Sequence, residues 1–448
     1  MTILSQSAAA KEPPRPLVTS LAVTDLFNRF NHTIALSQDS PFGIIIGPNG
    51  IGKTRFLELA LSAITLRGDA LSTTPYRTFS VHYSDGVVLR YSRSVRSDRP
   101  RVKATLIAGD AKTDIDIDVR KYTPEFLNRL DERVPLPRAS IDTWWDDETG
   151  GQLDADEVIQ RYAPELRQAP PTVYEKLAPY VRSDGASLIE TQRLIRTGGF
   201  SSRVPARVRM RQSRSATTVA LFSEELATQL GERFADSGRI GQQLDRTFAS
   251  RVLKRTPPTI DEETVRAAYS EQLEFRERLV QIGIADPAPE VLLPTDALLE
   301  PELRLMEEYL EDSRKKLEVF ADILSKVELM QDIIRDKFLY KRFSITRDGF
   351  KVESEEPKPR PIPLSTLSSG EQHELVLVYS LLFETAAQSI VMIDEPELSL
   401  HVRWQRRFLS DLTQIAKLTA VRFLVATHSP QIIDEWWDAT TELDTGWR

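Results

Sequence analysis

The chain has 448 residues, of which 41% are hydrophobic and 28% charged, and its formal net charge is −8. It contains no cysteine, which excludes disulfides, thiolate zinc sites and cysteine nucleophiles. No apolar run reaches the roughly 18 residues that a membrane span needs. Residues 1–16 lack a basic start followed by an apolar core, so they predict a disordered lead and not a secretory signal. We therefore expect a globular cytoplasmic protein with no membrane partner.

The first half of the chain predicts strands around one helix. Residues 17–36 suggest one or two strands, and the β-branched run that ends at Gly47 is typical of a buried parallel strand. A glycine-rich loop follows, and then a helix over residues 55–66. Asp85-Gly86 is a strong turn signal between two alternating runs, which predicts a hairpin. Residues 121–184 suggest helices and loops, and residues 186–194 a strand that leads into a loop.

The second half begins with a helical region over residues 201–337. Its last helix carries a near-heptad apolar stripe, which is interrupted by Ser313 and Gln331. The stripe consists of Leu310, Leu317, Phe320, Leu324, Val327, Ile334 and Phe338. It predicts either an amphipathic helix packed on its own domain or a short coiled-coil arm for assembly. A second hairpin is expected to turn at Asp348-Gly349. Two more buried strands are expected before Asp394 and His428.

A glycine loop with a known chemistry lies between the first buried strand and its helix. The pattern G-x-x-x-x-G-K-[ST] is formed by Gly47, Pro48, Asn49, Gly50, Ile51, Gly52, Lys53 and Thr54. Glycines let backbone N–H groups turn toward phosphate oxygens, and the helix that follows offers its positive N-terminal end. Lys53 is the candidate for the β- and γ-phosphates and Thr54 for Mg²⁺. The context of strand, loop and helix favours an ATP site over a structural turn.

Two adjacent acids end the strand of residues 389–394. Asp394 is the candidate ligand for Mg²⁺, and Glu395 the residue that orients or deprotonates the attacking water. Taken alone, such a pair is also compatible with surface acids. Together with the glycine loop, it predicts hydrolysis of ATP, with Lys53 and Glu395 in catalytic roles.

The segment LSSGEQ, residues 367–372, resembles the signature motif of ABC-type ATPases. The resemblance implies that Ser369, Gly370 and Glu371 contact the γ-phosphate of ATP held by a second copy. It also implies that residues 396–401 touch that copy and that His428 is a switch histidine at the γ-phosphate. Gln192 is the implied sensor of Mg²⁺ and water. A solvated amide is the plainer interpretation of Gln192.

The roles of three further groups of residues stay open. Arg29, Asn31 and His32 are candidates for contact with adenine or ribose, or plain hairpin residues. Two basic stretches could grip phosphate backbones, or they could be a solvated loop or a face for an acidic partner. They comprise Arg90, Arg93, Arg96, Arg99, Arg101 and Lys103 in one stretch, and Arg203, Arg207, Arg209, Arg211 and Arg214 in the other.

Within the ABC-type ATPases, the run from LSSGEQHELV through DEPELSLH to ATHSPQII resembles the RecF/SMC-like and OLD-like AAA group. The implied fold is α/β: an ATPase head with a mixed sheet around the P-loop, an antiparallel part and an inserted helical or coiled-coil arm. The expected divisions are a lead (1–16), an N-terminal half of the head (17–200), the helical insert (201–340) and a C-terminal half of the head (341–448).

The resemblance allows three functions. Stand-alone members of this group resemble the ATPase subunits of bacterial anti-phage systems of the PARIS or Septu type. In those systems a separate nuclease is the effector. The alternatives are a DNA-repair or chromosome-maintenance ATPase and, least favoured, the nucleotide domain of a transporter. Only twenty residues follow His428, so we expect any nuclease to be a separate protein. ATP and Mg²⁺ are the expected cofactors, and a homodimer or higher homo-oligomer the expected assembly.

Overall fold

The computed structural model describes most of the chain. The described residues are 15–37, 40–66, 69–96, 99–117, 176–190, 218–253, 257–285, 292–398 and 400–443, with short pieces between 131 and 158. The chain divides into two compact units. Unit 1 combines residues 1–211 with 384–448, and unit 2 is residues 212–383. The functional boundaries expected at residues 200 and 340 stay predictions.

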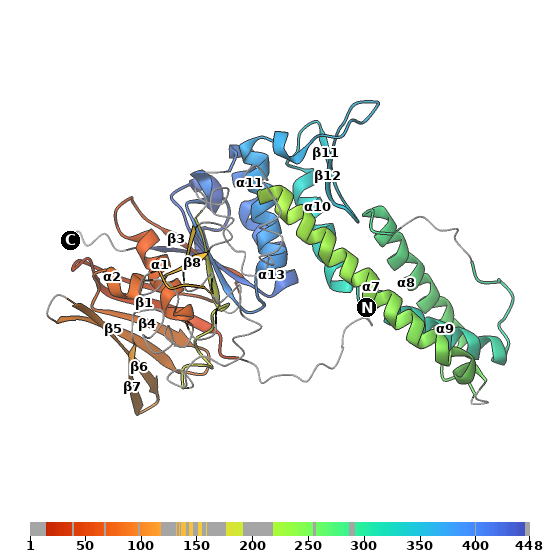
Figure 1. Ribbon diagram of the computed structural model, residues 1–448, viewed down its shortest axis with the longest axis horizontal. Helices are drawn as coiled ribbons and strands as arrows, with labels where there is room; N and C mark the ends of the chain where they lie inside the picture. The colour runs from red at the N-terminus through yellow and green to blue at the C-terminus, as the bar shows by residue number, and fades with distance from the viewer. Residues whose placement is uncertain are drawn as a thin grey trace. The chain divides into compact units, whose positions relative to one another are not determined.

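Unit 1 contains two sheets. The first has six strands in the order β2-β1-β4-β5-β6-β7, and all of its pairings are antiparallel. Its strands are β1 (Val18–Leu26), β2 (Phe30–Ala35), β4 (Thr78–Tyr83), β5 (Val88–Arg96), β6 (Arg99–Ala108) and β7 (Ala111–Ile117). The hairpin expected at Asp85-Gly86 is confirmed as β4 and β5. Figure 1 shows this sheet in orange.

The second sheet is parallel, with the order β10-β13-β14-β3-β15. Its strands are β3 (Phe42–Ile46), β10 (Ala186–Glu190), β13 (Ile390–Asp394), β14 (Arg422–Ala426) and β15 (Thr440–Glu442). The buried runs expected to end before Gly47, Glu395 and Thr427 are confirmed as β3, β13 and β14. Segments that are far apart in the sequence therefore form one parallel sheet.

Helix α1 (Lys53–Thr65) joins the two sheets into one core. It contacts β4 of the antiparallel sheet and β10 and β13 of the parallel sheet. Phe56, Leu57 and Ala60 on this helix are fully buried, and they belong to one apolar cluster with Leu21, Phe79 and further residues of both sheets. This burial fixes the start of α1, and with it the glycine loop.

The other elements of unit 1 are short, apart from α13. The helices are α2 (Ala70–Thr73), η4 (Pro396–Leu398), α12 (Val402–Gln405), α13 (Phe408–Thr419), α14 (Pro430–Ile433) and η5 (Trp437–Ala439), and the remaining strands are β8 (Thr143–Asp146) and β9 (Gly151–Asp154). Among the described residues, no helix combines the length and apolarity that a membrane crossing requires.

Unit 2 is a helical arm with a small base. The arm is α7 (Thr218–Val252), α8 (Glu262–Gln281) and α9 (Glu300–Glu318), with α9 packed on both α7 and α8. Figure 1 shows α7 as one long green helix. The base consists of α10 (Ala321–Arg335), β11 (Lys341–Thr346), β12 (Gly349–Ser354), η2 (Leu364–Thr366), α11 (Ser369–Tyr379) and η3 (Ser380–Glu384). The second expected hairpin is confirmed as β11 and β12.

The apolar stripe lies on two helices, whereas the sequence suggested one. The chain turns between α9 and α10, where the N–H of Phe320 donates to the carbonyl of Leu317 at 2.9 Å. The turn places the ring of Phe320 at 5.0 Å from that of Phe234 on α7. The interrupting residues Ser313 and Gln331 are buried as well. The stripe is therefore packed within unit 2.

Candidate functional site

The carboxyl ends of the parallel strands bring most of the expected site residues of unit 1 to one edge. Asp394 at the end of β13 is level with Ala426 of β14 and with Glu190 of β10, and Ala426 is level with Ile45 of β3. In open parallel sheets, ligands bind at this edge because the loops that follow the strands converge there. The glycine loop, the acids and the switch loop all begin at this edge.

The glycine loop leaves β3 in a shape that requires glycine. Gly47 has a φ of 152°, and a Cβ there would lie 2.3 Å from Cδ1 of Ile51. Gly52 has a φ of 92°, and a Cβ would lie 2.8 Å from Cδ2 of Leu26. No side chain caps the start of α1, and no acid lies in its first turn. The first N–H groups of this helix are therefore available for an anion.

Lys53 and Thr54 have defined partners in this loop. The Nζ atom of Lys53 donates to the carbonyl oxygens of Gly47 at 2.7 Å and Pro48 at 3.2 Å, and only 5% of the residue is exposed. The hydroxyl of Thr54 donates to Oδ2 of Asp394 at 2.6 Å. These two residues are 340 positions apart in the sequence. The structure therefore joins the loop to the acidic strand end.

Glu395 has a strained backbone. Its φ is +46°, a left-handed conformation that costs a non-glycine residue about 1–3 kcal/mol. Its N–H donates to the carbonyl of Ala426 at 2.9 Å, and its carbonyl accepts from the N–H of Leu398 at 3.1 Å. These bonds hold the backbone of Glu395 in the turn directly after β13.

His428 is held by a carboxylate that the sequence analysis did not single out. Glu397 accepts from Nδ1 of His428 at 2.8 Å, from the N–H of His428 at 2.9 Å and from the hydroxyl of Thr427 at 2.8 Å. The Glu397 side chain is 7% exposed, whereas that of His428 is 47% exposed. A carboxylate only accepts, so Nδ1 carries the proton and Nε2 is left for other contacts. The sequence signal that could have identified Glu397 is its place as the third acid of Asp394-Glu395-Pro396-Glu397.

A second side chain fastens the same two loops to each other. Gln405 donates to the carbonyl oxygens of Glu397 at 3.3 Å and Leu400 at 3.2 Å. Its Oε1 accepts from the hydroxyl of Ser429 at 3.1 Å. The loop of residues 396–401 and the loop that carries His428 are thus connected through Glu397 and Gln405.

The signature segment belongs to unit 2. Ser369 begins α11 and is exposed, and Gly370 follows it. Ser368 caps the helix: its hydroxyl accepts from the N–H of Glu371, and its own N–H donates to Glu371 Oε2 at 2.8 Å. The Glu371 carboxylate also accepts from Nζ of Lys341 at 2.7 and 2.8 Å. The Glu371 side chain thus fixes the helix start, and its contact with nucleotide stays a prediction.

The pKa of Glu371 reflects these partners. Burial raises the pKa, but the hydrogen bonds from Lys341 and Ser368 outweigh it, so the pKa lies below its ordinary value. Glu371 therefore stays ionised near neutral pH. Lys337 forms a second, more deeply buried ion pair with Glu374 of the same helix.

Other expected contacts have a mixed outcome. His32 is 2% exposed, and its Nε2 lies 3.1 Å from the carbonyl oxygen of Ile51, so it supports the glycine loop from inside the core. Lys103 pairs with Asp114 at 2.6 Å on exposed strands. Gln192 lies outside the described residues, although β10 reaches the edge beside Asp394 two positions earlier. The second basic stretch, residues 203–214, also lies outside them.

The residues present fit Mg²⁺ with a phosphorylated nucleotide. Mg²⁺ is usually bound by one or two protein oxygens, with water and substrate phosphates completing its shell. The Thr54 hydroxyl and the Asp394 carboxylate form such a pair, beside the start of α1. Among the described residues, no group of three His, Cys, Asp or Glu side chains could hold a metal by itself.

Comparisons with known proteins give partial matches. The sequence model described as "AAA domain, putative AbiEii toxin, Type IV TA system" matches residues 231–434. A stretch of 84 residues is 34% identical to the chromosome partition protein Smc of Rhodopseudomonas palustris. That stretch is 18% of this chain and spans 7% of the Smc protein.

Two solved structures align over most of the chain with low similarity. The Smc head domain of Pyrococcus furiosus, with an extended coiled coil and bound to the C-terminal domain of ScpA, has a TM-score of 0.35 and 12% identity. The alignment covers 96% of each chain. An SmcHead bound to the C-winged helix domain of ScpA has a TM-score of 0.33 and 11% identity, with coverage of 93% and 91%. Over residues 231–434 the chain is therefore similar to the family whose model is described as an AAA domain.

Proposed function

We propose that the chain binds ATP with Mg²⁺ at the carboxyl edge of unit 1 and hydrolyses it. The observation that carries the proposal is the 2.6 Å hydrogen bond from Thr54 to Asp394, because it unites a phosphate-type loop with a carboxylate at the end of a neighbouring strand. Bound Mg²⁺ would neutralise charge on the phosphates. Lys53 and the first N–H groups of α1 hold the phosphates, and Thr54 and Asp394 hold the metal.

In this proposal Glu395 orients a water and takes its proton, and His428 presents Nε2 to the terminal phosphate. The fixed backbone of Glu395 and the carboxylate behind His428 support these roles, since a catalytic side chain must be held in place by its neighbours. Gln192 is the proposed sensor of the metal and the water. Gly47, Pro48, Asn49, Gly50, Ile51 and Gly52 complete the proposed cradle.

We further propose that two copies meet face to face. Ser369 and Gly370 lie at an exposed helix start, which offers a hydroxyl and N–H groups to an anion. Two-fold symmetry then makes two equal sites, each with the loop of one copy and the signature of the other. ATP would close the pair and hydrolysis would open it, so the dimer works as a switch.

As the biological role, we propose an anti-phage defence complex in which this switch controls a separate nuclease. The match to a model named for a putative toxin supports this role. Chromosome maintenance is the second candidate, supported by the segment 34% identical to an Smc protein. Copurification with the product of a neighbouring nuclease gene, with and without ATP, would separate the two roles. A complex that forms only with ATP, or that ATP dissociates, favours the defence role.

The experiment for the enzymatic proposal is ATP turnover by the purified chain and by Lys53→Ala. The substitution removes the cation of the loop, so we expect hydrolysis to fall to background and nucleotide affinity to drop. Lys103→Ala, which removes an exposed lysine of the same unit, is the matched control and should leave turnover unchanged. Equal turnover by Lys53→Ala and the unmodified chain would show that the loop is not the active site.

A further inference from the structure

A small cavity lies at the opposite edge of the parallel sheet. Ile390 begins β13, Arg422 begins β14, and Gly185 comes directly before β10, and all three line this cavity. Asp394 ends β13 four residues after Ile390. A strand rises about 3.3 Å per residue, so the cavity is about 13 Å from the nucleotide edge. It is therefore separate from the site proposed above.

Three arginines line the cavity, and they are unevenly neutralised. Arg182 forms a two-pronged pair with Asp184, at 2.9 and 2.8 Å. The charge of Arg15 acts on the same carboxylate and helps to lower its pKa, after the hydrogen bond from Arg182 and the Arg182 charge. Arg422 has no ion pair in the part of the chain that the structure describes, and its Nη1 atom is buried there without a hydrogen-bond partner.

The position of Arg422 is costly without a further partner. Burial is the cause that lowers the pKa of its guanidinium, which means that the charged form has lost hydration. Arg422 is partly exposed, but its Nη1 atom is buried, and a buried charged group normally has an opposite charge or several hydrogen bonds to offset the lost hydration. Arg15 and Arg182 line the same cavity, and Asp184 offsets the charge of Arg182. A water molecule could accept from Nη1 but would leave the charge uncompensated.

We propose that this cavity binds a phosphate-type oxyanion, with Arg422 as the principal contact and Arg15 and Arg182 as supporting contacts. Its volume of about 30 Å³ has room for about two water-sized groups. Two oxygens of a tetrahedral anion fit inside, on the guanidinium fork that suits them. The rest of the anion faces the exposed Arg15 side. The bound anion connects the starts of β13 and β14, which end at Asp394 and before His428.

The test is calorimetric titration of inorganic phosphate into the full chain at constant ionic strength, with excess Mg²⁺ and ADP to fill the nucleotide loop. Arg422→Gln should weaken phosphate at least about tenfold, because a charge-assisted fork is lost. Arg15→Gln should weaken it a few-fold. Arg77→Gln removes a 78% exposed guanidinium of the same unit and should have no effect.

Arg422→Lys and Arg15→Gln keep the test valid if Arg422→Gln does not fold. The lysine keeps a cation without the fork, and Arg15 lies at an exposed position. If both variants bind ADP and also bind phosphate as tightly as the unmodified chain, the proposal is wrong. Glycerol phosphate as a second titrant distinguishes the source of the anion. If glycerol phosphate binds more tightly than inorganic phosphate, the cavity is a site for a phosphomonoester. If it binds more weakly, the cavity is a site for the free ion. The absence of binding heat with both ligands overturns the site.

Discussion

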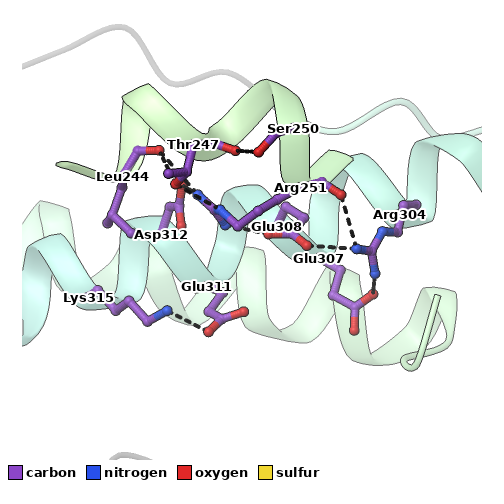
Figure 2. A network of polar contacts seen from close by, with 10 residues as sticks. All are labelled: Leu244, Thr247, Ser250, Arg251, Arg304, Glu307, Glu308, Glu311, Asp312 and Lys315. Carbon is purple, nitrogen blue, oxygen red and sulfur yellow. Dashed lines mark hydrogen bonds and ion pairs between the residues drawn. The ribbon is translucent and has the colours of Figure 1, made fainter. Parts of the chain in front are cut away.

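The carboxylates of the sheet edge and those of the helical arm are held in different ways. In the arm, Arg251 donates to both Glu308 and Asp312, and Arg304 donates to Glu308 at 2.8 Å (Figure 2). At the edge, Asp394 accepts from a threonine hydroxyl, and Glu397 accepts from a hydroxyl, an amide and an imidazole. Guanidinium groups thus hold Glu308 and Asp312 of the arm, whereas hydroxyl, amide and imidazole groups hold Asp394 and Glu397 of the edge.

This difference indicates what each region does. A carboxylate on a charged fork is a structural partner, since the pair holds two helices in register. A carboxylate that accepts from hydroxyl and amide groups keeps lone pairs that a cation can use. Substitutions in both regions test this difference.

Glu395→Gln should lower hydrolysis by about 10²–10⁴-fold while ATP binding persists, because the amide cannot take a proton from water. The proposed Mg²⁺ ligand Asp394 is unchanged, so ATP should accumulate in a closed dimer. ATPase rates and mass measurements by light scattering, with and without ATP, give both readouts. Loss of ATP binding, or a mass that ATP never changes, would contradict the role of Glu395.

Mixing Ser369→Arg with Lys53→Ala should restore hydrolysis that neither variant has alone. In a mixed dimer one site receives both changes and the other receives neither. With random exchange, half of the dimers are mixed and each has one intact site, so activity should recover to about a quarter of the unmodified level. No recovery after verified subunit exchange would exclude a signature that acts across the dimer.

Glu397→Ala should lower hydrolysis about tenfold with little change in ATP affinity, because His428 loses the acceptor that orients its ring. In a His428→Ala background the same substitution should have almost no further effect, which a double-mutant cycle measures. Glu397→Gln, which keeps one acceptor for Nδ1, should retain part of the activity. Additive losses in the cycle would show that Glu397 acts independently of His428.

Arg251→Met should destabilise unit 2 by about 1–3 kcal/mol without affecting ATP binding. The change leaves Asp312, whose side chain is 6% exposed, without its guanidinium. The loss is smaller than for a fully buried pair because Arg251 itself is 22% exposed. Urea unfolding and nucleotide binding are the measurements. Arg239→Met removes an exposed pair of the same helix and is the control. Equal effects of the two substitutions would show that the network is not structural.

Lys341→Met should have the smallest effect, and one that depends on pH. The pKa of Glu371 lies below its ordinary value of 4.5. The stability from this pair is therefore present above that pH and is lost as the pH falls through the lower, folded-state pKa. The difference in unfolding free energy between Lys341→Met and the unmodified chain should thus shrink below about pH 4.5. A difference that is constant down to pH 3 would show that the Glu371 charge is not involved.

The sequence by itself determined the chemistry-bearing motifs and their local elements. Gly47 to Thr54 between an apolar run and a helical period specifies strand, loop and helix, because the periodicities and the glycines are local properties. The two hairpins were predicted for the same reason, from the turns at Asp85-Gly86 and Asp348-Gly349. The α/β fold also followed from these motifs.

Only the tertiary structure decided which distant residues meet. Three features depend on the register of the parallel strands, which the order of the chain does not reveal. They are the hydrogen bond from Thr54 to Asp394, the hydrogen bonds from His428 to Glu397 and the cavity around Arg422. The break between α9 and α10 was missed because a heptad stripe continues through a turn when Phe320 packs on another helix. Side-chain partners and burial are set by packing between segments that lie from 31 residues apart, as for Glu397 and His428, to 340 residues apart, as for Thr54 and Asp394, and this information is not local.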